Sequence, residues 1–219
     1  MIKGFIFDLD GVITDTAEYH YLAWRELANK LGISIDRKFN EQLKGISRTD
    51  SLEKILNYGG KSQTYSEAEK NELADEKNKE YQKLIQSITP ADLLPGMAEF
   101  LAEIKAANLK LGLASASKNG PFILERLGIA NLFDTVVDPE SLKKGKPDPE
   151  IFTKGAKQLG LTISECVGIE DAEAGIESIN AAGMFSVGVG SPEAMRFADI
   201  YVAKTAELNL EMIQKQIKS

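Results

Sequence analysis

The sequence predicts an α/β fold: a doubly wound parallel sheet with an all-helical domain inserted after the first strand. Three observations indicate this class. Short apolar segments rich in β-branched residues alternate with longer helical patterns, which is typical of βαβ units. Two of the segments, 4–7 and 111–114, are apolar throughout, as strands are when helices cover both faces of a sheet. One long region carries helical patterns alone.

The expected strands are apolar segments bounded by polar or glycine-containing turns. They lie at residues 2–8, 110–115, 135–137, 166–170, 185–189 and 200–202. The helices expected between them lie at residues 95–107, 120–127, 148–159, 172–182 and 208–217. Hydrophobic residues make up 43% of the 219-residue chain, which is enough for a true core and excludes a disordered chain or a disulfide-stabilised miniprotein.

The helical region covers residues 16–87. Its four expected helices lie at residues 17–31, 38–43, 49–56 and 66–85. The chain leaves the core near Asp15 and returns near Pro90 and Pro95, because prolines mark a break between elements. We therefore expect an α/β core domain of residues 1–15 and 88–219 and a helical cap domain of residues 16–87. Two neighbouring connections would form a natural hinge.

Charge and composition restrict the partners. The net charge of −7 disfavours nucleic acid or an anionic membrane and leaves room for a small anionic ligand. Cys166 is the only cysteine, so no internal disulfide can form and a reducing, cytoplasmic setting is expected. No apolar run approaches the ~20 residues of a membrane span. The apolar N-terminal stretch is interrupted by Lys3, Asp8 and Asp10, so we expect no signal peptide. We also expect the protein to be a monomer.

Two carboxylates follow the first expected strand. Asp8 and Asp10 are spaced i, i+2, which places both on one side of the strand at its C-terminal end, and Gly11 permits a sharp turn after them. Open α/β sheets bind ligands at this end. Crowded carboxylates repel unless a cation or a shared proton compensates, so the pair indicates a ligand site. The alternative is a solvated, aspartate-rich turn.

Three further polar segments follow other expected strands. They are Ser115-Ala116-Ser117-Lys118-Asn119, Gly145-Lys146-Pro147-Asp148-Pro149 and Glu170-Asp171. The carboxyl ends of parallel strands meet at one edge of the sheet, so we expect all four segments to converge. A hydroxyl, a lysine and two acidic pairs suit a phosphoryl group with a hard divalent cation such as Mg²⁺, which prefers oxygen ligands.

The four segments together resemble the motifs of the haloacid dehalogenase (HAD) superfamily, which has a Rossmann-like core. The matching residues are Asp8-Leu9-Asp10-Gly11, Ser115, Lys146 and Glu170-Asp171. The all-helical insert resembles the cap of one subgroup. Segments 11–20, 43–48 and 114–122 further resemble the β-phosphoglucomutase family within this superfamily.

This resemblance implies a Mg²⁺-dependent mutase acting on a small sugar phosphate. It would interconvert β-D-glucose 1-phosphate and D-glucose 6-phosphate, with an aspartyl phosphate on the enzyme and β-D-glucose 1,6-bisphosphate as the intermediate. The nearest alternative is a HAD-type sugar-phosphate phosphatase, in which water attacks the same aspartyl phosphate. A non-catalytic HAD-like scaffold is the alternative from another class, and the complete motif set argues against it.

The resemblance also implies roles for residues of the core. Asp8 would be the nucleophile and Asp10 the general acid and base. Ser115 and Lys146 would bind the transferring phosphoryl group. The ligands implied for Mg²⁺ are the Asp8 carboxylate, the Asp10 main-chain carbonyl, Glu170 and Asp171. Lys146 is aligned to the motif because it directly precedes Pro147, and Lys144 is the alternative.

For the helical domain, the resemblance implies substrate binding and control of closure. Arg48 would bind the second phosphate of the substrate, with Ser117, Lys118 and Asn119 helping from the core. Thr16, His20 and Lys77 match positions that orient Asp10. Other residues expected near the substrate are Trp24, Leu43, Lys44, Gly45, Ser51 and Ala116.

Several of these residues also have a purely structural interpretation. A single histidine such as His20 is usually a packing or surface residue, and Trp24 one turn later suits helix packing. Arg48 stands at a helix start, where an exposed arginine is common. Lys77 lies in the charged run 67–83, which fits a solvated helix face. Cys166 lies in an apolar strand and is expected to be buried and inert.

Overall fold

The computed structural model describes residues 1–218. The chain forms two compact units: Met1–Asp15 together with the chain from Ile88 onward, and Thr16–Ser87 between them. The first is an α/β unit and the second is entirely helical.

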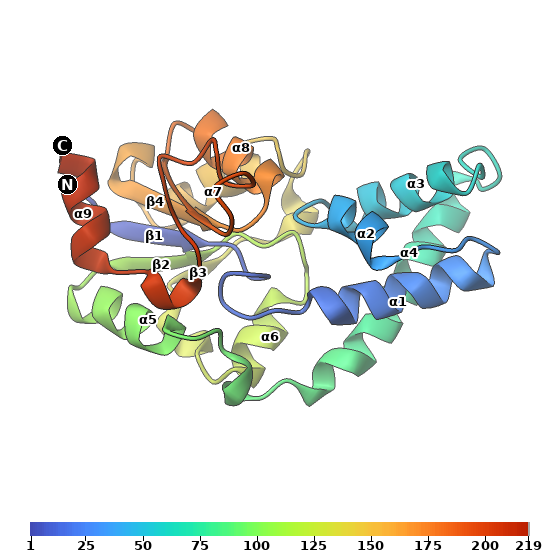
Figure 1. The fold of residues 1–219 in the computed structure, drawn as a ribbon, viewed down its shortest axis with the longest axis horizontal. Helices are drawn as coiled ribbons and strands as arrows, with labels where there is room; N and C mark the ends of the chain where they lie inside the picture. The colour runs from blue at the N-terminus through green and yellow to red at the C-terminus, as the bar shows by residue number, and fades with distance from the viewer. Residues whose placement is uncertain (219) are drawn as a thin grey trace. The chain divides into compact units, whose positions relative to one another are not determined.

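The α/β unit is built on a six-stranded sheet in which every neighbouring pair is parallel. The strand order is β3-β2-β1-β4-β5-β6. Figure 1 labels β1 between β2 and β4. The strands are β1 (Gly4–Phe7), β2 (Lys110–Leu113), β3 (Thr135–Val136), β4 (Cys166–Glu170), β5 (Phe185–Val189) and β6 (Ile200–Val202). This architecture confirms the predicted doubly wound parallel sheet and the helical insertion after its first strand.

The N-terminal strand β1 lies at the centre of the sheet. Its residue Phe7 is paired in register with Leu113 of β2 on one side and with Ile169 of β4 on the other. All four residues of β1 are buried, which explains why this strand lacks an alternating polar pattern. Phe5 and Phe7 make edge contacts with Phe100, with ring centroids 5.9 and 6.1 Å apart.

Helices cover both faces of this sheet. In Figure 1, α7 and α8 lie on one side and α5 on the other, consistent with the contacts that these helices make with the strands. The α-helices of the unit are α5 (Met97–Ala106), α6 (Gly120–Arg126), α7 (Glu150–Gln158), α8 (Glu173–Ala181) and α9 (Leu210–Lys218). Short 3-10 turns complete the connections at η3 (Pro90–Asp92), η4 (Ala130–Leu132), η5 (Pro139–Ser141), η6 (Ile163–Glu165) and η7 (Thr205–Glu207).

The helical unit has its own apolar core and well-defined helix starts. Its elements are α1 (Ala17–Lys30), α2 (Arg37–Asn40), η1 (Glu41–Leu43), α3 (Arg48–Tyr58), α4 (Glu67–Leu84) and η2 (Ile85–Ser87). Ser47 accepts a hydrogen bond from a backbone N–H of α3, and Ser66 forms a capping box with Glu69 at the start of α4. Apolar side chains from α1 and α3, including Leu27 and Leu56, fill the centre of the unit.

The structure differs from the expected elements mainly at their ends. The first strand stops at Phe7 because Asp8 already belongs to the following loop. The helix expected at 95–107 begins at Met97, since Gly96 before it has a φ of 82° and cannot be helical. The helix expected at 38–43 is a short α-helix followed by a 3-10 turn.

The two segments that join the α/β unit to its insertion are tied together within that unit. Thr14 Oγ1 donates a hydrogen bond to the main-chain oxygen of Asp92 at 2.7 Å, and Leu94 N donates to Ile13 O at 3.0 Å. Thr14 and Leu93 also form an antiparallel bridge. The departing and returning chains are therefore neighbours, as the sequence indicated.

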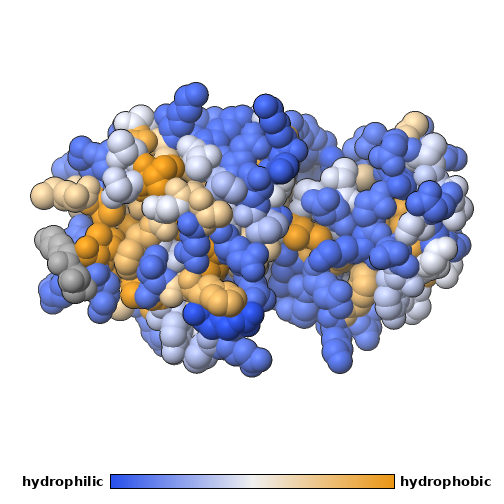
Figure 2. Space-filling model, turned by 90° about the horizontal axis from the view of Figure 1, so that it is seen from above, coloured by the Kyte–Doolittle hydropathy of each residue, from blue (hydrophilic) through white to orange (hydrophobic). Residues whose placement is uncertain are grey.

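The surface is largely polar. Figure 2 shows hydrophilic residues over most of the visible face, with hydrophobic residues in separate groups. The large hydrophobic side chains with the most exposed surface are Met1, Tyr58, Phe197 and Tyr201. Among the described residues, none of the helices combines the length and apolarity that a membrane crossing requires.

Candidate active site

Two strand ends and one connecting loop place charged side chains together at the carboxyl edge of the sheet. Asp8 follows β1 and Glu170 ends β4, and these strands are neighbours. Lys146 comes from the connection between β3 and α7. Its Nζ lies 2.6 Å from Asp8 Oδ1 and 2.7 Å from Glu170 Oε2. The structure thus joins motifs that are up to 162 positions apart in the sequence (170 − 8 = 162).

The loop after β1 turns sharply to present Asp8. The Asp8 N–H still bonds to Ile169 O at 2.9 Å, and Gly11 N closes the turn by donating to Thr14 O at 2.8 Å. Gly11 has a φ of 72°, and a Cβ at this position would overlap the Asp171 carboxylate. Glycine is therefore required here both for the backbone conformation and for the approach of Asp171.

Of the two candidate lysines, Lys146 and Lys144, it is Lys146 that lies against the Asp8 and Glu170 carboxylates. Its side chain is completely buried, whereas that of Lys144 is 76% exposed and its ammonium lies 4.0 Å from Asp148. Burial alone would lower the pKa of Lys146, but the carboxylates of Asp8 and Glu170 outweigh it and raise the pKa. Lys146 therefore carries a fixed positive charge between two acidic groups.

Glu170 is the most enclosed of the acidic groups, with no exposed surface. Burial, and then the neighbouring Asp8 carboxylate, raise the pKa of Glu170 to about 7 against the opposing effect of Lys146. Its Oε1 accepts hydrogen bonds from the backbone N–H groups of Asp171 and Ala172, both at 3.1 Å. Gly175 of α8 leaves the space that the carboxylate fills, because a Cβ there would overlap it.

A divalent cation fits this acidic cluster. One carboxylate oxygen from each of Asp8, Glu170 and Asp171 lies within 4.8 Å of the others, and these oxygens are the hard ligands that Mg²⁺ prefers. A cation would also offset the repulsion between acidic groups held so close together. The Asp10 side chain is not part of this three-carboxylate group among the described residues.

The loop after β2 carries hydroxyl groups with ordered positions. Ser115 is 3% exposed, and its Oγ accepts a hydrogen bond from Ser117 N at 3.1 Å. Ser117 Oγ in turn accepts from Asn119 N at 3.3 Å, just before α6 begins. Lys118 pairs with Glu140 at 3.0 Å. The backbone of Ala116 lies within this same loop, between the two serines.

In the helical unit, four of the predicted site residues lie together along the seam between α1 and α4. Lys77 Nζ is 2.7 Å from His20 Nδ1 and 4.7 Å from the centroid of the Trp24 ring. Thr16 Oγ1 is 2.8 Å from the hydroxyl oxygen of Tyr81. Lys77 is only 3% exposed, so it does not belong to the solvated face that its charged surroundings suggested.

Tyr81 is the member of this group that sequence reasoning missed. It is fully buried, and its ring stacks on His20 with centroids 4.0 Å apart. The available signal was its spacing, since Tyr81 stands four residues after Lys77 and therefore on the same face of the helix. It was missed because α4 is dominated by charged residues.

The remaining predicted residues of the helical unit lie near the start of α3. Arg48 is the first residue of α3, and its guanidinium lies 3.6 Å from Asp75. Ser51 is buried and donates to Ser47 O at 2.9 Å. Lys44 pairs with Glu41 at 2.8 Å, next to buried Leu43, and Gly45 has a φ of 73°.

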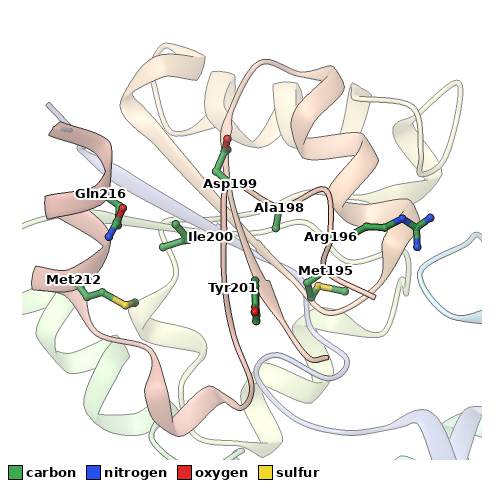
Figure 3. Close-up of a pocket in the computed structure, with 8 residues that line it drawn as sticks. All are labelled: Met195, Arg196, Ala198, Asp199, Ile200, Tyr201, Met212 and Gln216. Atoms are coloured by element: carbon green, nitrogen blue, oxygen red, sulfur yellow. The ribbon is translucent and has the colours of Figure 1, made fainter. Parts of the chain in front are cut away.

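A separate cavity of about 400 Å³ lies between β6 and α9 (Figure 3). Met212 and Gln216 project from α9 toward Ile200, while the Arg196 side chain points away from the cavity. Its eight lining residues include none of the predicted site residues. The cavity therefore shares no residue with the predicted site at the carboxyl edge of the sheet.

The comparisons with known proteins agree with the fold and with the motifs. Residues 2–183 match the family described as haloacid dehalogenase-like hydrolase. The chain is 53% identical over 215 residues to β-phosphoglucomutase of Bacillus subtilis (strain 168), covering 98% of this chain and 95% of the relative. It is 31% identical over 187 residues to fructose-1-phosphate phosphatase YqaB of Escherichia coli (strain K12), covering 85% of this chain and 95% of the relative.

A solved structure shows the same similarity. The crystal structure of β-phosphoglucomutase from Clostridium difficile superposes with a TM-score of 0.98 at 53% identity, covering 100% of this chain and 98% of that one. The predicted resemblance to β-phosphoglucomutases is thereby confirmed. With a matching family over most of its length and a set of strand-end motifs gathered at one sheet edge, the chain is an enzyme of the haloacid dehalogenase-like hydrolase family.

Proposed function

We propose that the chain is a Mg²⁺-dependent mutase that interconverts β-D-glucose 1-phosphate and D-glucose 6-phosphate. The observation that carries this proposal is the 53% identity, over nearly the whole of both chains, to a β-phosphoglucomutase. The geometry supports it, because Asp8, Lys146, Glu170 and Asp171 form a site suited to a phosphoryl group and a cation. The substrate would be a free small molecule.

Asp8 is the nucleophile in this mechanism. Its carboxylate oxygen attacks the phosphorus of a sugar phosphate or bisphosphate, the bond to the sugar oxygen breaks, and an aspartyl phosphate forms. Asp10 gives a proton to the departing sugar oxygen and takes one from the sugar hydroxyl in the return step. Forming a covalent intermediate divides one difficult transfer into two easier ones.

Lys146 and Ser115 stabilise the transferring group. The buried ammonium of Lys146 is already 2.6 Å from Asp8, so its charge acts on the phosphoryl oxygens without further desolvation. The Ser115 hydroxyl adds a hydrogen-bond donor from the neighbouring strand end. Asp8, Glu170 and Asp171, with the Asp10 carbonyl, would hold Mg²⁺. When bound, this ion neutralises charge on the phosphoryl oxygens.

The intermediate would be β-D-glucose 1,6-bisphosphate, formed when the sugar takes the phosphoryl group from Asp8. The bisphosphate would then reorient, so that its other phosphate faces Asp8 and returns a phosphoryl group to the enzyme. Arg48 is proposed to hold the phosphate that is not reacting, because a guanidinium binds phosphate through two parallel hydrogen bonds. Ser117, Lys118 and Asn119 are proposed to assist it from the loop after β2. Thr16, His20 and Lys77 are proposed to orient Asp10.

A second candidate is a sugar-phosphate phosphatase. The 31% identity to fructose-1-phosphate phosphatase YqaB favours this candidate, because both chemistries need the same strand-end motifs. The difference is whether a sugar hydroxyl or water attacks the aspartyl phosphate. The two activities are therefore best compared in one preparation.

The deciding experiment couples the product to glucose 6-phosphate dehydrogenase. The enzyme is incubated with Mg²⁺, β-D-glucose 1-phosphate and a trace of β-D-glucose 1,6-bisphosphate, and NADPH formation is compared with the release of inorganic phosphate. A mutase forms glucose 6-phosphate much faster than it releases phosphate. Phosphate release that equals or exceeds glucose 6-phosphate formation would instead establish the phosphatase.

A further inference from the structure

Five side chains form a continuous ladder along the seam of α1 and α4. In order they are Thr16, Tyr81, His20, Lys77 and Trp24, and each contacts the next. Thr16, His20 and Trp24 are four residues apart at the start of α1, and Lys77 and Tyr81 are four apart on α4. Residues at this spacing share a helix face, so the two helices interleave their side chains.

Tyr81 joins Thr16, at one end of the ladder, to the His20–Lys77 pair. Its hydroxyl is 2.8 Å from Thr16 Oγ1, and its ring is stacked on His20 at an interplanar angle of 29°. Lys77 Nζ lies 4.6 Å from the centroid of the same ring. Both Tyr81 and Thr16 have no exposed surface, so their hydroxyl pair is shielded from competing water.

Lys77 determines which nitrogen of His20 carries the proton. An ammonium group has only donors, so Nδ1 must accept from Lys77 and the neutral ring holds its proton on Nε2. Desolvation, and then the charge of Lys77, hold the pKa of His20 well below its usual value, in agreement with a neutral ring. Tyr81 covers one face of this ring and limits its rotation.

We propose that Tyr81 is a positioning residue for the reaction, acting through Thr16 and His20. Its hydroxyl fixes the orientation of the Thr16 hydroxyl, and its ring fixes the plane of the His20 imidazole. Tyr81 does not touch the reacting atoms in this proposal. The assignment rests on the proposed function, in which Thr16, His20 and Lys77 orient the general acid and base Asp10.

Tyr81→Phe is the primary test because it removes the hydroxyl and keeps the ring. A lost hydrogen bond of ordinary strength predicts that kcat for the mutase reaction falls about three- to tenfold, with KM for the sugar phosphate changed less than about twofold. Tyr21→Phe is the matched control, since Tyr21 is also a buried tyrosine of the helical unit but lies outside the ladder. Its kcat should equal that of the parent.

A double-mutant cycle separates positioning from a general structural effect. If Tyr81 acts through the Thr16 hydroxyl, Tyr81→Phe should cost nothing further in a Thr16→Val background. In a Thr16→Ser background, which keeps the hydroxyl, the loss should persist. An unchanged kcat in Tyr81→Phe, or the same loss in the parent and the Thr16→Val background, would overturn the proposal.

A spectroscopic readout tests the ladder independently of turnover. His20 is the only histidine, so its imidazole NMR signals are assigned without ambiguity. The nitrogen shifts should report the neutral form protonated at Nε2, and the ring protons should move when Tyr81→Leu removes the stacked ring but not when Tyr81→Phe retains it. Ring protons that do not respond to Tyr81→Leu would overturn the stacking part of the proposal. If the parent lacks mutase activity but shows these signals, the proposed function fails while the ladder stands.

Discussion

The ammonium group of Lys146 lies 2.6 Å from a carboxylate oxygen of Asp8, and the lysine side chain has no contact with solvent. The same ammonium is 2.7 Å from Glu170, which is also fully buried. One positive charge thus holds two acidic side chains from adjacent strands. Loss of the charge on Lys146 would therefore leave the Asp8 and Glu170 carboxylates without their shared partner.

Removing the proposed nucleophile, Asp8, should abolish turnover without unfolding the chain. Asp8→Asn keeps the size and much of the hydrogen bonding of the side chain, but an amide cannot form an acyl phosphate. We expect no detectable mutase or phosphatase activity and an unchanged circular dichroism spectrum. Mass spectrometry after incubation with bisphosphate should show phosphorylation of the parent only. Turnover of Asp8→Asn at the parental rate would contradict the covalent mechanism.

Removing the buried lysine should reduce stability as well as activity. Lys146→Met leaves Asp8 and Glu170 facing each other without compensation, and loss of one partner of a buried ion pair costs about 3–5 kcal/mol in the free energy of unfolding. Urea denaturation measures this difference. Lys144→Met is the control, because the Lys144 side chain is 76% exposed. This substitution should change the free energy of unfolding by less than about 0.5 kcal/mol. Equal effects of the two substitutions would refute the assignment of Lys146.

The acidic cluster should set the proposed requirement for Mg²⁺. Asp171→Ala removes one of three carboxylates whose oxygens lie within 4.8 Å of one another. The Mg²⁺ concentration that gives half-maximal activity should therefore rise, by about tenfold or more if one ligand is lost. Binding of Mn²⁺, followed by electron paramagnetic resonance, should weaken in parallel. Full activity of the parent in excess chelator would show that no cation is needed.

Arg48 should matter only for substrates with a second phosphate. Arg48→Ala is expected to slow transfer to and from the sugar phosphates by about 10²-fold, because remote binding energy is used to assemble the reacting groups. Hydrolysis of a small aryl phosphate should change little. Arg37→Ala is the control, since Arg37 pairs with Glu18 on the surface of the same helical unit. Equal losses with both kinds of substrate would remove Arg48 as the phosphate clamp.

The neutral state of His20 should make stability depend on pH. Its pKa is held below that of the unfolded chain, so below about pH 6.5 the unfolded state binds more protons than the folded state. The contribution of His20, taken as the free energy of unfolding of the parent minus that of His20→Gln, should therefore rise as pH increases from 5.5 to 6.5, by at most about 1.4 kcal/mol per pH unit, and then level off. Glu170, whose pKa is raised to about 7, contributes in the opposite direction in this window, and its contribution cancels in the difference because both proteins carry it. A curve of unchanged shape in that variant would mean that His20 does not titrate differently in the folded state.

The sheet was predictable because each strand is marked by its own composition. The boundaries of β4, β5 and β6 agree with the expected ones, since burial on both faces makes a strand apolar along its whole length. Strand ends were less predictable, as at Asp8, because its N–H still donates a hydrogen bond to Ile169 of β4 although the strand has already ended at Phe7. The helix expected at 38–43 ended early for a similar reason, since a 3-10 turn differs from an α-helix by hydrogen bonds and not by composition.

The candidate site was predictable where a topological rule brings residues together. Asp8 and Glu170 end neighbouring parallel strands, so their meeting follows from the sheet order alone. The adjacent Pro147 favoured Lys146 over Lys144 in the sequence, and the structure brings the Lys146 ammonium into the cluster while the Lys144 side chain is exposed. Tyr81 was not found because a tyrosine in a charged helix carries no motif. Only the packing of α1 against α4 shows that it is buried.

The central position of β1 has a consequence for how the chain is made. On the ribosome, residues 4–7 emerge before their two hydrogen-bonding partners, β2 and β4, which begin only at Lys110 and Cys166. The whole of Thr16–Ser87, with its own apolar core, is synthesised before either partner appears. The apolar core of the insertion can therefore be completed during synthesis, whereas the first strand stays an unpaired apolar segment until β2 and then β4 have been made.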